Sequence, residues 1–245
     1  MLSCILVLVG VPSSAGASGI QSIDEAQKAY AEGRFTDAAR IGEALGTSRG
    51  FALAAESLSI HAHYIAGDDE KGVLLERAIG LARKAIDSDP DNAEGHLQLA
   101  RAIGRRAQTV GAFGAAGRGY AEKIRESAEN ALRIDPELAA AHLSLGRWHA
   151  ELVGTLGSFM ARVLYRARKK DAFASFERAL ELAPGSKAGP LEYALGMLAL
   201  DKTKHREKAR EMLNRAIGIP ARDAYEEFLH ARAIERLETL DATGG

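Results

Sequence analysis

The chain has 245 residues, of which 47% are hydrophobic and 27% are charged, and its 32 basic side chains nearly balance 33 acidic ones. This balance excludes a chain-wide attraction to nucleic acid, so no nucleic-acid partner is expected and any basic site must be local. The single cysteine, Cys4, excludes an internal disulfide framework and a cysteine-rich metal site.

The first twenty residues differ in composition from the rest of the chain. The apolar stretch LSCILVLVGV is followed by PSSAGAS, which has small residues at Ala15 and Ala17. This pattern predicts a signal peptide over residues 1–17, cleaved after Ala17, a short linker over 18–22, and export to the periplasm or cell envelope. No Lys or Arg precedes the apolar run, so the alternative is the apolar N-terminus of a cytoplasmic protein.

A repeated pattern precedes three of the prolines. Small or apolar residues stand twelve, eight and five positions before each proline, on one face of a predicted helix. Such self-similarity is typical of stacked helical hairpins, in which small residues let helices approach closely. The residues are Ala78, Ala82 and Ala85 before Pro90; Ile124, Ala128 and Ala131 before Pro136; and Ala172, Phe176 and Ala179 before Pro184.

The repeat resembles the tetratricopeptide repeat. The stretch HLSLGRWH (142–149) follows the family pattern W-x2-L-G-x2-Y with histidine at both aromatic positions, and ASFERALELAP supplies the later A-x3-F and proline. AYAEGRFTDAARIGEAL matches a first unit, and a more degenerate unit ends at Pro220. The resemblance implies an all-α, right-handed superhelix of about five units over residues 23–240, followed by a disordered tail over 241–245.

The spacing of the prolines predicts two insertions. Consecutive prolines from Pro90 to Pro136 to Pro184 are 46 and 48 residues apart, whereas a plain tetratricopeptide unit takes about 34. Each insertion should lie between the first and second helices of its unit. The first, VGAFGAAGRG (110–119), contains four glycines and is predicted to be a flexible loop, since no Lys-Ser or Lys-Thr follows it to form a phosphate-binding loop.

The second insertion, GTLGSFMARVLYRARKK (154–170), predicts a basic amphipathic helix over 156–170. Its apolar residues recur at helical spacing, and five positive charges follow with no acidic residue among them. Either the stripe packs on the array with the charges in water, or it contacts a membrane, an anionic amphiphile or an acidic protein. The stripe is Leu156, Phe159, Met160, Val163 and Leu164; the predicted membrane or anionic-ligand contacts are Phe159, Arg162, Arg166, Lys169 and Lys170.

A narrower resemblance covers residues 85–200. AHLSLGRW, the basic insertion and ASFERALELAPGSK, preceded by AAGRGYAEKIRESAENALRIDP, resemble the regulator of microtubule dynamics family. That resemblance implies a helical-repeat adaptor or a lipid-associated protein rather than an enzyme. The predicted signal peptide departs from the eukaryotic members, so a microtubule role is not carried over.

The predicted binding site is the concave groove formed by the first helices of successive units. His96 and His142 occupy the same position in two repeats, which also indicates a packing role, and Trp148 is a candidate for the core or for stacking on a ligand. His61 and His63 point to different sides of a helix, so no metal site is expected. The groove residues are predicted to be His96, Leu97, Arg101, His142, Arg147, Tyr193 and Met197.

The functional prediction is a non-catalytic binding or scaffold protein without a cofactor. The sequence does not contain H-E-x-x-H, the motif of a common class of zinc hydrolases. We expect the groove to bind a protein or peptide partner. The alternative is a carrier of a lipid-like molecule that uses the basic insertion.

Overall fold

The computed structural model describes residues 22–242, without the side chains of 112 and 113. The predicted signal peptide and residues 18–21 of the predicted linker lie outside this range. The helical part extends further than predicted at the other end, because Asp241 and Ala242 belong to the last helix. Asp241 is anchored there by an ion pair of 2.7 Å to Arg210.

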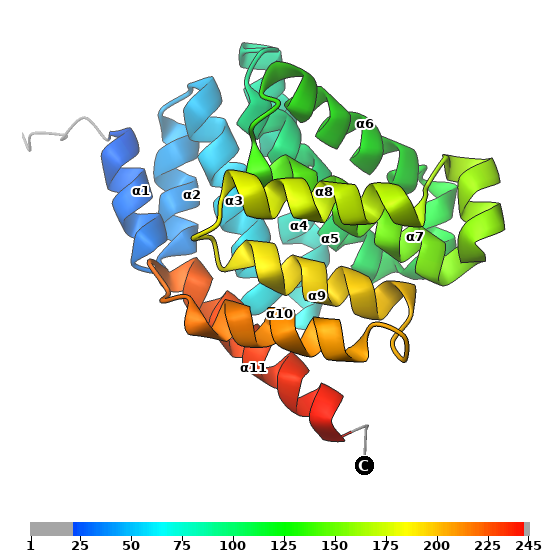
Figure 1. The fold of residues 1–245 in the computed structure, drawn as a ribbon. Helices are drawn as coiled ribbons and strands as arrows, with labels where there is room; N and C mark the ends of the chain where they lie inside the picture. Colours follow the sequence, from blue (N-terminus) through cyan, green and yellow to red (C-terminus); the bar gives the residue numbers. More distant parts are fainter. Residues whose placement is uncertain (1–21, 243–245) are drawn as a thin grey trace, which may run out of the picture.

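The described residues form eleven α-helices and no strand (Figure 1). The helices are α1 (Ile23–Ala31), α2 (Phe35–Ala44), α3 (Ser48–Tyr64), α4 (Asp68–Ser88), α5 (Ala93–Gly117), α6 (Tyr120–Ile134), α7 (Ala139–Tyr165), α8 (Lys169–Leu182), α9 (Ala188–Leu200), α10 (Arg206–Gly218) and α11 (Ala224–Ala242). Consecutive helices pack as hairpins from α1–α2 to α9–α10, and α11 follows them. The predicted all-α array of stacked hairpins is therefore confirmed.

The helix ends lie where local chemistry places them. Helices α4, α6, α8 and α10 each stop two residues before a proline, since proline clashes with a continuing helix. Two of the first helices begin at polar caps. Before α5, the Asn92 side chain accepts a hydrogen bond of 3.1 Å from the Gly95 amide, and before α3, Thr47 accepts one of 3.1 Å from the Gly50 amide. The units are thus separated by sequence-local signals.

The small residues of the repeat pattern form the contacts between helices. All of the alanines at the predicted positions are buried, as is Phe176, whereas Ile124 is only partly buried. A Cβ atom on Gly146 would lie 2.7 Å from Cε1 of Phe176, so this position of α7 accepts only glycine without rearrangement. The packing agrees with the tetratricopeptide pattern predicted from the sequence.

Glycine kinks interrupt the two longest helices. Gly111 in α5 has φ 70° and ψ 173°, and Gly157 in α7 has φ 75° and ψ 155°, a region that is nearly closed to other residues. Each glycine stands 21 residues after the proline that precedes its helix. We call residues 111–117 the α5 end and residues 157–165 the α7 end.

Both predictions for the insertions need correction. The α5 end is helical rather than a loop, because one glycine takes up the bend and its alanines then favour a helix. The predicted helix over 156–170 is divided: α7 ends at Tyr165, and Lys169 and Lys170 begin α8.

The last helix bridges the two ends of the array. Helix α11 contacts α1 as well as α9 and α10, and its first turns lie beside the α1–α2 hairpin (Figure 1). The Phe228 ring stacks on Tyr64 of α3 at 5.0 Å and lies 6.2 Å from Phe35 of α2. Helix α11 therefore crosses the inner face and partly covers it.

Candidate functional site

A cavity of about 710 Å³ lies on the inner face of the array. Residues of α5 and α7 form most of its wall, and α3, α6, α9 and α11 complete it. The α5 end takes part through Gly111 and Ala115. Binding sites for small molecules range from about 300 to 1,000 Å³, so the cavity has the size of a site for one compact ligand.

Four charged residues recur along the inner face at spacings of 45, 46 and 45 residues: Glu56, Arg101, Arg147 and Glu192. They form two ion pairs between neighbouring first helices, Glu56 with Arg101 at 3.3 Å and Arg147 with Glu192 at 3.3 Å. Burial raises the pKa of the Glu56 carboxyl, although Arg101 opposes this effect. The repeat thus places one charge per unit in a row, and Arg147 also pairs with Glu151.

Two more arginines add positive charge to the cavity wall. The Arg105 guanidinium donates a hydrogen bond of 2.6 Å to the Ser59 hydroxyl, and Arg232 reaches the cavity from α11. Burial, together with the charges of Arg105 and Arg232, lowers the pKa of His63 to about 4. His63 is consequently neutral at pH 7.

The balance of charge around the cavity is positive. Its wall contains four arginines and two glutamates, and Glu56 behind the wall still leaves an excess of one positive charge. Because arginine guanidinium groups make charge-assisted hydrogen bonds to carboxylate and phosphate oxygens, the wall favours an anionic group. We call this site the arginine pocket.

Aromatic and aliphatic side chains form the remaining surface of the arginine pocket. Trp148 is 5% exposed and its Nε1 donates a hydrogen bond of 2.7 Å to the Ala121 carbonyl. Leu143, Leu152 and Ile124 line the same cavity. Trp148 therefore belongs both to the packed interior and to the pocket wall, the two roles between which the sequence left a choice.

The structure divides the seven predicted groove residues. Arg101 and Arg147 line the arginine pocket. Nε2 of His96 lies 3.0 Å from the Pro90 carbonyl oxygen, and Nε2 of His142 lies 3.0 Å from that of Pro136. These histidines hold equivalent junctions between units, which confirms their repeat-related packing role and places both away from the pocket wall.

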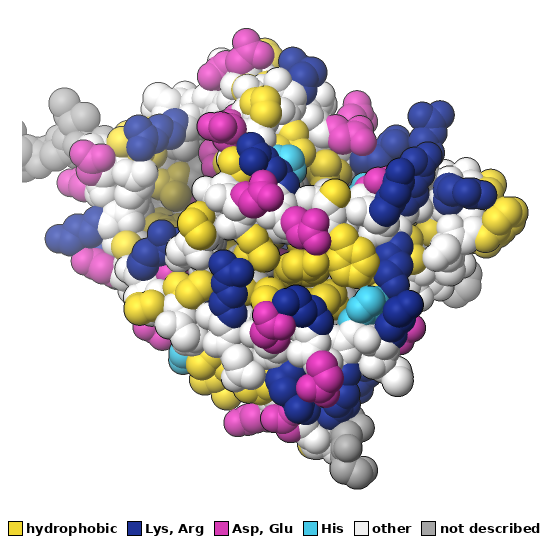
Figure 2. All heavy atoms as spheres, in the orientation of Figure 1, with side chains coloured by type: hydrophobic (Ala, Val, Ile, Leu, Met, Phe, Trp, Pro, Cys, Tyr) yellow, Lys and Arg dark blue, Asp and Glu magenta, His cyan; other side chains and the backbone are white. Residues whose placement is uncertain are grey.

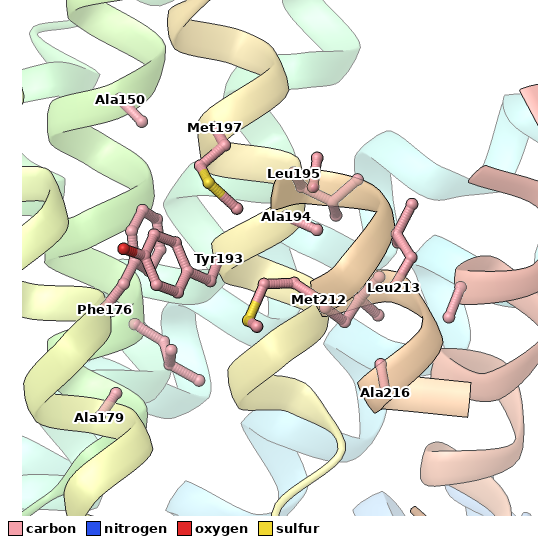
Figure 3. Packing of buried hydrophobic residues seen from close by; sticks show 14 of the residues in the cluster. Ala150, Phe176, Ala179, Tyr193, Ala194, Leu195, Met197, Met212, Leu213 and Ala216 are labelled. Atoms are coloured by element: carbon pink, nitrogen blue, oxygen red, sulfur yellow. The ribbon is translucent and has the colours of Figure 1, made fainter. Parts of the chain in front are cut away.

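The other three predicted groove residues lie in the core, and their assignment to the groove is wrong. Leu97 is fully buried among residues of α6 and α7. Tyr193 stacks on Phe176 at 5.0 Å, and Met197 is 1% exposed in the same cluster (Figure 3). Their helices do reach the inner face, but the superhelical packing turns these apolar side chains toward neighbouring helices.

Sequence reasoning missed most of the arginine pocket. Glu192 repeats the spacing of Arg101 and Arg147, so extending the repeat alignment by one unit would have identified it. Arg105 follows Arg101 by one helical turn, on the same face of α5. Arg232 carries no such signal, because only the position of α11 brings it to the cavity.

The apolar stripe of the second insertion is exposed. The exposed fraction is 68% for Phe159, 58% for Val163 and 55% for Leu164, with 43% for Met160 and 37% for Leu156. The interpretation in which the stripe packs on the array is therefore wrong. Figure 2 shows hydrophobic atoms at the right-hand edge of the molecule with Lys and Arg atoms beside them.

The basic residues of this insertion have different surroundings. Arg162, Arg166 and Lys170 are exposed. Lys169 is partly buried, and its Nζ lies 2.9 Å from Nε2 of His205 and 5.7 Å from the centre of the Phe173 ring. Lys169 thus contacts α8 and the loop before α10, and its predicted membrane contact needs correction.

Two further searches cover residues 22–242 only. No group of three or more His, Cys, Asp or Glu side chains in this range could hold a metal ion. None of the described helices is both long and apolar enough to cross a membrane.

The stacked hairpins and their inner-face cavity define a tetratricopeptide-like helical-repeat protein, a class that binds other proteins along its inner face. The profile of the family described as Regulator of microtubule dynamics protein 1-3 matches residues 50–241, and the chain belongs to this family. The crystal structure of a thermophilic TPR protein of Thermus thermophilus has the same fold, with a TM-score of 0.60 and 19% identity over 87% of this chain and 97% of that chain. A comparison with curated proteins finds no match.

Proposed function

We propose that the protein is a non-catalytic binding protein that captures the carboxyl end of a partner polypeptide in the arginine pocket. The observation that carries this proposal is the excess of arginine over glutamate in the wall of a cavity on the inner face. A terminal carboxylate presents two oxygens, which match the paired donors of a guanidinium group.

The size of the cavity favours a chain end over a long helix. A volume of about 710 Å³ suits a ligand of small-molecule size, and α11 bridges the inner face. The apolar wall at Leu143, Leu152 and Trp148 would receive the side chains next to the terminal carboxylate.

Peptide arrays test this proposal directly. Random hexapeptides displayed with free carboxyl ends should bind, and the same peptides with amidated ends should not. Replacing one buried guanidinium partner of a charged group typically costs about 2–5 kcal/mol, so we expect Arg232→Gln to weaken binding by more than about tenfold. Arg40→Gln, an exposed arginine on α2, is the matched control and should bind as the parent does.

A second candidate ligand is an amphiphile with an anionic head group, favoured by the apolar residues in the same cavity wall. The peptide arrays, together with native mass spectrometry of the purified protein, distinguish the two candidate ligands. Equal binding of free and amidated peptides would contradict the peptide proposal. An added mass of several hundred daltons that extracts into organic solvent would establish the amphiphile.

We also propose that the protein acts in the cell envelope. The support is the apolar stretch before the small residues Ala15 and Ala17. A fusion of residues 1–22 to alkaline phosphatase, which is active only outside the bacterial cytoplasm, tests this proposal. An inactive fusion would place the protein in the cytoplasm.

A further inference from the structure

The α7 end carries an exposed apolar surface without any neighbour in the described part of the array. Phe159 and Val163 are each more than half exposed, and Leu164 and Met160 lie beside them. Large apolar side chains that are adjacent on one surface mark an interaction site more often than single ones do. The function proposed above uses the arginine pocket and leaves this surface unexplained.

The backbone holds this surface outward. Gly157 bends α7, and the helix that follows is anchored by Ala161, which is fully buried and packs with Ala167, Val153 and Trp148. On a helix with 3.6 residues per turn, Phe159 and Val163 point roughly 200° away from Ala161. The face that packs on the array through Ala161 and the exposed apolar face are therefore on opposite sides of the same two helical turns.

Positive charge borders the apolar face. Arg162 precedes Val163 at the edge of this face, and Arg166, Arg168 and Lys170 follow; all four are exposed. Arg166 ends the helix in a left-handed conformation, with φ 61°. No Asp or Glu occurs between Glu151 and Asp171, so the charge of this segment is not balanced by its own residues.

We propose that the α7 end docks the protein on an anionic lipid surface. The apolar side chains would enter the boundary between head groups and acyl chains, while the arginines bind lipid phosphates and the aliphatic parts of their side chains remain in the apolar layer. The charge selects this occupant over a second copy of the chain. A twofold contact would place the same cations opposite one another, which is unfavourable.

Vesicle co-sedimentation of the full chain tests the proposal. We expect binding to phosphatidylcholine vesicles that contain phosphatidylglycerol, weak binding to phosphatidylcholine alone, and loss of binding at high ionic strength. Each basic residue near such a surface contributes about 1 kcal/mol. Reversing three charges, with Arg162→Glu, Arg166→Glu and Lys170→Glu, should therefore weaken binding by at least about a hundredfold.

Two matched controls accompany this variant. Arg40→Glu, Arg49→Glu and Arg83→Glu make the same change of net charge at positions on α2, α3 and α4, away from the α7 end, and should leave most of the binding intact. For the apolar face, Phe159→Ser with Val163→Ser should weaken binding by about tenfold or more. The control for that pair is Val73→Ser, a 73% exposed residue of α4.

Three results would overturn the proposal. The first is undiminished vesicle binding by the charge-reversed variant that folds normally by circular dichroism. The second is a parent protein that does not bind anionic vesicles and instead forms a dimer that the Phe159 and Val163 replacements abolish. The third is a parent protein that binds an acidic polypeptide through this face but no vesicles. None of these results depends on what the arginine pocket binds.

Discussion

The α5 end and the α7 end begin with the same backbone feature and then differ completely. In both, a glycine with positive φ bends a first helix 21 residues after the preceding proline. The α5 end turns to the cavity, which Gly111 and Ala115 line. The α7 end packs on the array through Ala161 and exposes its larger side chains.

The difference teaches that side-chain size and charge decide what a repeated backbone feature does. The described side chains of the α5 end are small, and two of its residues, Gly111 and Ala115, form part of the cavity wall. The α7 end carries phenylalanine, methionine, valine, leucine and arginine side chains that are exposed. One kink therefore helps to form a pocket and the other an exposed face.

Replacement of Trp148 should have the largest effect, because this residue connects the two regions. Its ring packs with Ala161 below the α7 end and also lines the cavity that the α5 end helps to enclose. We expect Trp148→Ala to lower the free energy of unfolding by about 3–5 kcal/mol, measured by urea denaturation followed by circular dichroism. Trp148→Phe keeps most of the volume and should cost less. A loss below about 1 kcal/mol for the alanine variant would contradict this role.

The next largest effect is a pH dependence of stability that follows from the burial of His63 in the cavity wall. The pKa of His63 is lowered to about 4, first by burial and then by Arg105, Arg232 and Lys71. Since the unfolded chain binds a proton near pH 6.5 and the folded state does not, stability is complete above pH 6.5 and falls as the pH decreases toward 4. The loss is on the order of 3 kcal/mol.

Urea denaturation at several pH values checks this expectation. His63→Gln removes the titrating group, so the parent should lose more stability than the variant between pH 6.5 and pH 4, while carboxyl groups affect both alike. Parallel curves for the two proteins would mean that water reaches His63 in the folded state.

The smallest expected effect on stability comes from replacing the two glycines at the kinks. Gly111→Ala and Gly157→Ala place a side chain at positive φ, and each should lower the free energy of unfolding by about 1–3 kcal/mol. Gly80→Ala in α4 meets no atom within 4 Å and should instead stabilise the protein by about 0.5–1 kcal/mol. If either kink variant behaves like Gly80→Ala, the bend at that glycine is not maintained in solution.

Much of the fold could be predicted because its signals are local. The prolines that follow α4, α6 and α8 and the buried alanine stripes before them depend on chain chemistry and helical spacing, which are visible in the sequence. The exposed stripe at Phe159 and Val163 was visible too, as a pattern. Which way it faced was not, since an amphipathic helix looks the same whether its apolar face meets protein or solvent.

The sequence by itself determined the helical hairpins, their junctions and the recurrence of Arg101 and Arg147 on successive inner helices. Only the tertiary structure decided that Tyr193 and Met197 are core residues and that Arg232 joins the arginine pocket. The physical reason is the distance along the chain over which each kind of interaction acts. Helix signals act over a few residues, whereas the pocket wall combines residues of six helices, from His63 on α3 to Arg232 on α11, through packing that no local spacing encodes.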